Sequence, residues 1–316
     1  MSTISQVSIG VDISKDKLDV YIWENKEYRI FNNNMAGVQE FIKWTQLYKK
    51  IKNIVFEASG GYENDLKVAI ENNKLKFWLV DPRLVRYFIK SEGIKAKTDK
   101  IDAKMLAHFA FVKDAKYDSI TNTPEEVLLK SYVERRRQLI DMKQSETNRL
   151  RKPKSNLQKS NIQEHIDYLK QKIVEIENEI DNIMNSSEII KEKEEVLTSV
   201  PGFGKISSAS LISELPEIGK ISNKEISALV GVAPYNKQSG SYQGKQMTAG
   251  GRRSPRRTLY MSTLVAIRYN SVIKDFYQKL IADGKQKKVA IVACMRKLIC
   301  ILNTMIKKME KWMPQN

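Results

Sequence analysis

The stretch VSIGVDISKDKLDVYIW, residues 7–23, decides the fold of the N-terminal part of the chain. Apolar residues alternate up to Asp12, turn-forming residues occupy 14–16, and apolar residues alternate again from Leu18 to Ile22. This period of two predicts a β-hairpin whose first strand lies in a core. Asp12 then stands at the end of a buried strand, where a carboxylate is costly unless a compensating charge is near.

A second acid, Glu57, follows another short apolar run, at 54–56, in the segment IVFEASGGY. We expect this run to be a strand that delivers Glu57 to its edge. Gly60 and Gly61 come next, and their lack of a side chain would let backbone or ligand approach closely.

Asp99 and Asp102 lie three residues apart in KTDKIDAKMLAHF, residues 97–109, where apolar residues recur at helical spacing. The spacing places both carboxylates on one helix face, where they repel unless a cation lies between them. Together with Asp12 and Glu57 they suit a site for two Mg²⁺ ions roughly 4 Å apart, which stabilise the attacking and the leaving oxygen of a phosphoryl transfer. The alternative is that each acid is an ordinary solvated carboxylate.

The charge of the chain is strongly positive and unevenly distributed. The net charge is +17, and residues 231–316 hold 17 Lys or Arg against 3 Asp or Glu. Such a basic region predicts a polyanionic partner. A membrane surface is the competing interpretation, but small residues among the C-terminal apolar positions are typical of a packed core, which favours nucleic acid.

Several kinds of site and location are excluded by composition. No uncharged run exceeds eleven residues, which argues against a transmembrane helix, and the N-terminal residues lack the features of a signal peptide, so we expect a cytoplasmic protein. Cys294 and Cys300 cannot form a zinc site or a disulfide framework, and we interpret them, with His108 and His165, as core residues.

The rest of the chain changes in character near residue 120. Up to that point strand-like segments, among them 30–31, 54–56 and 77–80, alternate with helix-like ones, which predicts an α/β layer fold. A helix should begin at Pro124 after Thr123, and apolar steps of three and four from 166 to 183 indicate a coiled coil. We expect two long helices folded back around Pro153, which pair within one chain or between chains.

Two glycine-containing segments are candidates for nucleic-acid contacts. In SVPGFGKISSASLISEL, residues 199–215, Gly202 and Gly204 suggest a helix-hairpin-helix turn whose backbone N–H groups bind phosphate; a purely structural turn is the alternative. The second is PYNKQSGSYQGKQMTAGGRRSPRR, residues 234–257. Its basic residues suit phosphate oxygens, and they are Lys245, Arg252, Arg253, Arg256 and Arg257.

The motifs quoted above, together with VDPRLVRYFIKSEGIKAKTDKIDAKMLAHF and VGVAPYNKQSGSYQGK, resemble successive motifs of the DEDD insertion-sequence transposases. That family, number one hundred and ten of the insertion sequences, includes bridge-RNA-guided recombinases and is similar to the pilin-gene invertases. The resemblance runs from about residue 5 to about residue 310. The sequence departs from the usual motifs at Ser59, where Thr is common, and at Pro255, where Val is usual.

The resemblance implies a fold class and a domain order. A ribonuclease-H-like (RuvC-like) α/β domain with the acid tetrad would span residues 1–123. A coiled-coil helical hairpin would span 124–195, and a mainly α-helical C-terminal transposase domain 196–316.

The resemblance also implies a nucleophile and partners. Ser239 matches the family's nucleophilic serine, and Ser241 is the near alternative; by itself a Ser-Gly in a loop is weak evidence, because no histidine lies nearby to act as a base. The partners would be donor and target DNA and a bridge RNA that selects the target. The acid domain of one protomer would meet the serine domain of another in a homo-oligomer, a dimer or a tetramer.

These observations lead to three hypotheses. The first is a DNA transposase and recombinase, located in the bacterial cytoplasm on the nucleoid, in which a metal-bound acid tetrad polarises the scissile phosphate and Ser239 attacks it. The second is a hydrolytic, metal-dependent junction nuclease in which the serine is structural. The third is a basic coiled-coil protein that coats nucleic acid, which gives no reason for the acid tetrad. A covalent protein–DNA link distinguishes the first two.

Overall fold

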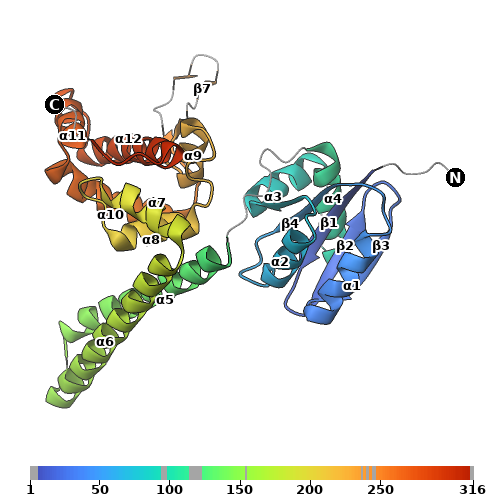
Figure 1. Cartoon of the computed structure of the whole chain (residues 1–316), viewed down its shortest axis with the longest axis horizontal. Coiled ribbons are helices and arrows are strands. Elements are labelled where there is room, and N and C mark those ends of the chain that lie inside the picture. The colour runs from blue at the N-terminus through green and yellow to red at the C-terminus, as the bar shows by residue number, and fades with distance from the viewer. Residues whose placement is uncertain are drawn as a thin grey trace. The chain divides into compact units, whose positions relative to one another are not determined.

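The protein consists of two compact units, Met1–Thr121 and Asn122–Asn316 (Figure 1). The computed structural model describes residues 6–93, 98–113, 123–153, 155–235, 238–239, 242–243 and 247–313, with only the backbone at 238–239 and 242–243.

A mixed five-stranded sheet forms the centre of the first unit, in the order β3-β2-β1-β4-β5. The strands are β1 (Val7–Ile13), β2 (Lys17–Ile22), β3 (Tyr28–Asn32), β4 (Ile51–Glu57) and β5 (Phe77–Val80). β2 is antiparallel to β1 and to β3, whereas β4 runs parallel to both β1 and β5. The predicted hairpin over 7–23 and the three predicted strands are confirmed, because period-two alternation is a local signal that survives folding.

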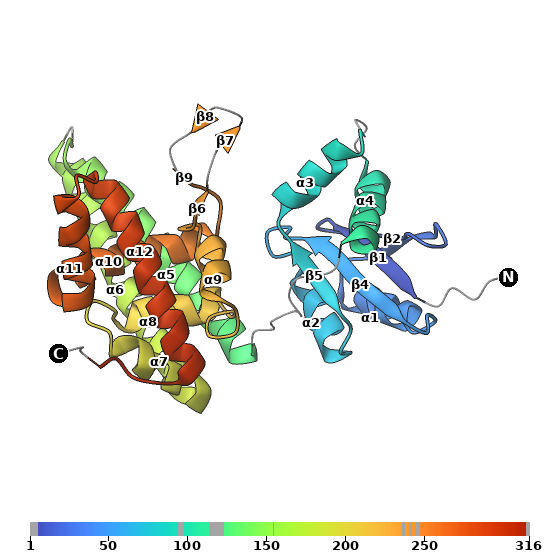
Figure 2. The same ribbon diagram turned by 90° about the horizontal axis from the view of Figure 1, so that it is seen from above.

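Each face of the sheet packs against its own pair of helices, as Figure 2 shows. Helices α1 (Met35–Thr45) and α2 (Asn64–Asn72) cover the face that carries Leu18, Val20 and Ile22. Helices α3 (Pro82–Ser91) and α4 (Asp99–Val112) cover the other.

Helix α4 packs directly on the backbone of β1 at Gly10. A Cβ at Gly10 would lie 2.1 Å from the backbone N of Ala107 and 2.3 Å from the carbonyl oxygen of Ala103. Only glycine allows this approach. Because α4 runs back along β1, its first turn lies near the carboxyl end of that strand.

The second unit is almost entirely helical. Its helices are α5 (Pro124–Leu150), α6 (Asn156–Ser186), α7 (Glu188–Thr198), α8 (Lys205–Glu214), α9 (Asn223–Val230), α10 (Arg253–Tyr269), α11 (Ser271–Ala282) and α12 (Lys287–Lys308). Four two-residue strands lie between α9 and α10: β6 (Pro234–Tyr235), β7 (Gln238–Ser239), β8 (Tyr242–Gln243) and β9 (Met247–Thr248).

Helices α5 and α6 form the expected hairpin around Pro153 and lie side by side along its length (Figure 1). Thr123 and Glu126 close a capping box at the start of α5, where the sequence predicts a helix start. Leu139 of α5 packs against Leu169 and Ile173 of α6. The base of the hairpin packs on α8, so in the structure the hairpin and the C-terminal helices belong to one compact unit.

Helix α12 lies in the core of the second unit. Cys294 in α12 is fully buried and Cys300 is partly buried, and both thiols are free. Within the described part of the chain, α12 is the one helix long and apolar enough to cross a membrane, with a mean hydropathy of 1.9, but half of that window is buried. Its burial is that of the core helix of a globular protein.

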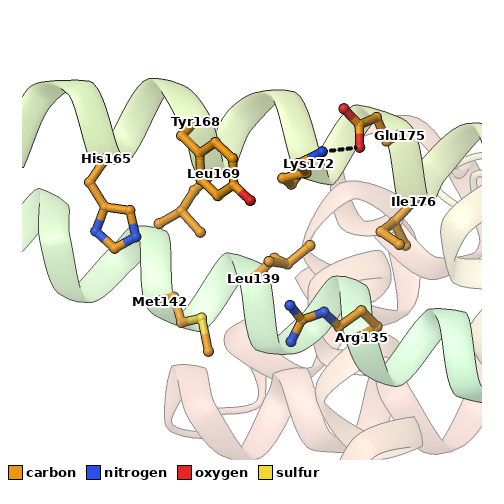
Figure 3. A pocket seen from close by; sticks show the side chains of 9 residues that line it. All are labelled: Arg135, Leu139, Met142, His165, Tyr168, Leu169, Lys172, Glu175 and Ile176. Carbon is orange, nitrogen blue, oxygen red and sulfur yellow. Dashed lines mark hydrogen bonds and ion pairs between the residues drawn. The ribbon is translucent and has the colours of Figure 1, made fainter.

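The interpretation of both histidines as core residues is wrong for His165. His108 is largely buried and stacks on Trp23 at 4.0 Å, whereas the His165 side chain is 49 % exposed. His165 lines an open groove of about 350 Å³ on the hairpin, together with Met142 and Tyr168 (Figure 3). Heptad spacing predicts which positions of a helix are buried, and His165 falls between them.

Candidate active site

The first unit brings together the acids that the sequence singles out. Val11 of β1 pairs with Phe56 of β4, so Asp12 and Glu57 follow at the same end of two neighbouring parallel strands. Strand pairing directs both side chains to the face covered by α4. Asp99 and Asp102 lie in the first turn of α4, which begins after Thr98, whose hydroxyl accepts a hydrogen bond from the Ile101 backbone N at 3.3 Å.

The pKa of Asp12 reflects its closeness to the other acids. Burial raises the pKa of Asp12 from 3.8 to about 6, and the charges of Asp102, Asp99 and Asp19, in that order, add to the shift. A hydrogen bond with the backbone of Ile13 opposes it. Carboxylates this close together destabilise one another, and a cation between them would remove that cost.

Asp19 is an acid that sequence reasoning missed. It lies opposite Asp12 in the β1–β2 ladder and its side chain is almost completely buried. It accepts hydrogen bonds from the Tyr28 hydroxyl and from the Lys17 ammonium, the latter at 3.1 Å. The signal was available in the alternation, because Asp12 and Asp19 both fall between core-facing apolar residues and therefore share the other face of the hairpin.

Lys17 supplies positive charge to this cluster. Its Nζ lies 2.7 Å from Oδ2 of Asp99 and 3.1 Å from Oδ2 of Asp19, which links the hairpin to α4. The pKa of the ammonium is raised above its ordinary value, first by the hydrogen bond to Asp99 and then by that to Asp19. We call Asp12, Asp19, Glu57, Asp99, Asp102 and Lys17 the acidic centre.

The donor set of the acidic centre suits a hard divalent cation, although its present geometry is not that of a metal cage. Within the described residues, no three Asp, Glu, His or Cys side chains are close enough to hold an ion as they stand. Mg²⁺ prefers oxygen donors. The raised pKa of Asp12 means that its charged form is destabilised, and a bound ion would remove that destabilisation.

The turn after Glu57 is held by a carboxylate of its own. Glu63 accepts hydrogen bonds from the backbone N of Ser59 and of Gly61, at 3.1 and 2.9 Å, and from the Ser59 hydroxyl at 2.9 Å. Burial raises the pKa of Glu63, but these hydrogen bonds outweigh it and the pKa is lowered. Gly60 has a φ of 78° and open space around its Cα, so it serves the turn conformation rather than a close approach.

In the second unit, Ser239 lies in the segment between α9 and α10, which we call the serine loop (residues 232–251). Strands β6 and β9 pair at its base, and Ser239 of β7 pairs with Tyr242 of β8. Ser241 and Lys245 lie outside the described residues. Within the described part of the loop, this pairing places Ser239 in a short strand opposite Tyr242.

The four arginines that follow the loop have different surroundings. Arg252 donates to both carboxylate oxygens of Glu217, at 2.6 and 2.7 Å, and Arg256 donates to the carbonyl of Gly231. Arg257 makes an exposed ion pair with Asp141 at 2.9 Å. The side chain of Arg253 is exposed, with no partner among the described residues.

The two glycines of the predicted helix-hairpin-helix turn also differ. Gly202 has a φ of 96°, and a Cβ there would lie 2.6 Å from the backbone N of Ala266 in α10. Gly204 caps the N-terminus of α8 with open space around it. Gly202 therefore serves packing, and Gly204 leaves the first N–H groups of α8 accessible.

Comparison with known proteins gives matches in both parts of the chain. A transposase family model of the DEDD type, IS110, matches residues 9–154, and the model of the IS116/IS110/IS902 transposase family matches residues 194–278. The chain belongs to the IS110 family of DEDD transposases. This membership makes it an enzyme of DNA recombination that acts on DNA.

Relatives of this IS110-family transposase extend over its whole length. It is 27 % identical over 320 residues to the pilin gene-inverting proteins of Moraxella bovis and Moraxella lacunata, which covers 96 % of this chain and 97 % of each relative. It is also 27 % identical over 114 residues to an uncharacterized insertion element IS110 protein of Streptomyces coelicolor, which covers 35 % of this chain and 28 % of that protein.

Proposed function

We propose that this transposase cleaves and rejoins DNA strands through a covalent phosphoserine link at Ser239, assisted by Mg²⁺ at the acidic centre. The observation that carries the proposal is the convergence of Asp12, Asp99 and Asp102: burial first, and then the charges of its acidic neighbours, raise the pKa of Asp12 to about 6. Acids that are placed together and repel one another have no structural advantage, whereas a cation-binding site needs them.

The acidic centre is proposed to hold the metal through Asp12, Glu57, Asp99 and Asp102, with two ions as the expected number. Bound Mg²⁺ would act as a Lewis acid on the scissile phosphate and offset its negative charge. We propose that Asp19 acts indirectly: it binds Lys17, and Lys17 in turn positions Asp99. The mixed sheet with acids at the ends of adjacent strands supports a ribonuclease-H-like, RuvC-like domain.

The serine step is a transesterification. The Oγ–P bond forms as the P–O bond to the departing DNA strand breaks, the serine proton is lost, and the departing oxygen is protonated. The phosphodiester energy is kept in the serine link, so the strand can be rejoined to a new partner without a nucleotide cofactor. The pilin gene-inverting names of the full-length relatives favour recombination over simple hydrolysis.

The remaining assignments are also proposals. Target choice is delegated to a bridge RNA, and the basic region after residue 231 binds nucleic-acid backbone. The hairpin α5–α6 is the proposed coiled-coil domain between an acid domain and a C-terminal domain. The working form is a homo-oligomer on the bacterial nucleoid, in which the acidic centre of one protomer meets the serine loop of another.

A trapped covalent intermediate tests the proposal. Wild-type protein with DNA from the ends of its element, its flanking RNA and Mg²⁺ should give a protein–DNA adduct on a denaturing gel, and peptide mass spectrometry should locate it at Ser239. Ser239→Ala should give neither adduct nor cleavage, whereas Ser241→Ala should give both.

Two outcomes would contradict this assignment. An adduct on Ser241 would move the nucleophile two residues along the loop. Cleavage by Ser239→Ala without any adduct would make the protein a hydrolytic nuclease.

A further inference from the structure

The serine loop has a rigidly built base. The chain enters it at Gly231, which ends α9 with a φ of 75°, and leaves it at Gly250 and Gly251. A Cβ at Gly231 would lie 2.2 Å from the carbonyl oxygen of Gly250, and one at Gly251 would lie 2.3 Å from the backbone N of Gly231. The two ends of the loop therefore cross in backbone contact, without side chains between them.

Arg252 holds the chain in place where it leaves the serine loop. Its backbone N donates to the carbonyl of Leu229 in α9 at 2.8 Å. Its guanidinium donates to both oxygens of Glu217, at 2.6 and 2.7 Å, and to the carbonyl of Glu214 at 2.9 Å. The Arg252 side chain is 41 % exposed but that of Glu217 only 15 %, so this bidentate pair is shielded from competing water and salt on the carboxylate side.

Arg256 holds the chain in place where it enters the serine loop. Its guanidinium donates to the carbonyl of Gly231, the residue that ends α9. This oxygen belongs to a helix C-terminus, where carbonyl groups lack intrahelical partners and favour a cation. Arg256 is only partly exposed, and its backbone is held in the first turn of α10.

Arg253 and Arg257 are differently placed. Both side chains are exposed, and among the described residues Arg257 pairs with Asp141 alone, which is itself 53 % exposed. An ion pair of this kind contributes little to stability and exchanges readily for another anion. The four arginines thus fall into two pairs. Arg252 and Arg256 bind groups of the protein itself, whereas Arg253 and Arg257 are available to bind a phosphate.

We infer that Arg252 and Arg256 are positioning residues, which hold the two described ends of the serine loop, residues 232–235 and 247–251, at a fixed place on α8, α9 and α10 and do not contact nucleic acid. The inference rests on the proposed function, since it matters for the reaction only if the loop carries the nucleophile. A hydroxyl must be held close to its target geometry for attack on phosphorus, and small misplacements lower rates by large factors.

The test compares four single variants of the full-length protein: Arg252→Gln and Arg256→Gln as anchors, with Arg253→Gln and Arg257→Gln as matched controls. Each loses one positive charge, so net charge cannot separate the pairs. Arg256→Lys is the conservative variant, because an ammonium can still donate to the Gly231 carbonyl.

Two readouts do not depend on catalysis. Amide hydrogen exchange at residues 232–235 and 247–251 should quicken at least tenfold in the anchor variants, while peptides from α12 keep wild-type rates. The slope of log affinity against log salt, measured with duplex DNA of random sequence, should stay at the wild-type value in the anchor variants. It should fall by about 0.7 to 0.9 in each control, as expected for one lost phosphate contact.

A third readout connects the anchors to the reaction. The rate of adduct formation should fall about a hundredfold in Arg252→Gln and Arg256→Gln at saturating DNA, and Arg256→Lys should recover most of it. If wild-type protein forms no adduct, the proposed nucleophile fails while the exchange and salt results still judge the anchors. A reduced salt slope with unchanged exchange in the anchor variants would overturn the inference and make these arginines phosphate contacts.

Discussion

The Nζ atom of Lys17 lies 2.7 Å from Oδ2 of Asp99, so a residue at the start of β2 carries the cation that neutralises the first residue of α4. The same ammonium contacts the buried Asp19 at 3.1 Å. If Asp99 binds a divalent ion, as proposed, Lys17 and the ion compete for this carboxylate, and the first prediction follows from that competition.

Lys17→Met should lower the melting temperature in EDTA, because Asp19 and Asp99 lose their counter-charge, and Mg²⁺ should restore more stability to this variant than to the wild type. Differential scanning calorimetry with and without Mg²⁺ measures both effects. Lys15→Met, in the exposed turn of the same hairpin, is the control and should respond to Mg²⁺ like the wild type. An equal response of the Lys17 and Lys15 variants would show that Lys17 does not compete with a metal.

Asp12→Asn should stabilise the metal-free protein at pH 7–8. The folded-state pKa of about 6 exceeds 3.8, so the protonated carboxyl is favoured by folding; its contribution is complete below about pH 4 and is lost as the pH rises through 6. A neutral amide escapes that loss, and the gain should be roughly 1–2 kcal/mol after allowance for solvent screening. Urea unfolding in EDTA between pH 4 and pH 8 measures it.

The gain from Asp12→Asn should shrink toward pH 4. Asp16→Asn, which changes an exposed carboxylate in the neighbouring turn, should give no comparable gain. A gain of the same size at every pH would mean that packing, not charge, separates Asp12→Asn from the wild type.

The turn before α8 should respond unequally to alanine. Gly202→Ala should cost about 2–4 kcal/mol, because its φ of 96° disfavours a side chain and the added Cβ meets α10. Gly204→Ala meets open space and should cost less than about 1 kcal/mol. Guanidinium unfolding of both variants measures the difference. Equal costs would refute the packing role given to Gly202.

Neighbouring arginines of α5 provide a matched pair for the hairpin. Arg137 donates to the buried Glu214 at 3.0 Å, and Arg136 donates to the more exposed Glu177 at 2.7 Å. Glu214→Ala should cost about 3–5 kcal/mol, because the partly buried Arg137 loses its counter-charge and the hydroxyls of Ser210 and Ser254 lose an acceptor. Glu177→Ala should cost about 1 kcal/mol or less. Thermal unfolding of the two variants checks the order, and a larger loss for Glu177→Ala would contradict it.

The parts of the fold that the sequence predicts are those specified by local signals. Alternating apolar residues define the hairpin at 7–23, and the Thr123 capping box defines the start of α5. The acids Asp12 and Glu57 stand out because each ends an apolar run. Each of these features is encoded within a few consecutive residues.

What the sequence does not predict depends on partners distant in the chain. The sequence predicts Arg252 as a phosphate ligand and gives no sign that Glu217, thirty-five residues earlier, accepts hydrogen bonds from its guanidinium. Lys17 looks like a turn residue until α4 places Asp99 beside it. Side-chain pairing across the fold is set by packing of whole elements, which a one-dimensional pattern does not record.

The acidic centre and the serine loop are built on separate hydrophobic cores of one chain. If both take part in one reaction, neither unit can cut a strand alone, and cleavage waits until the two are brought to the same phosphate. DNA that binds only one of the two units would then be released uncut. This division would limit damage to the host chromosome from non-specific binding.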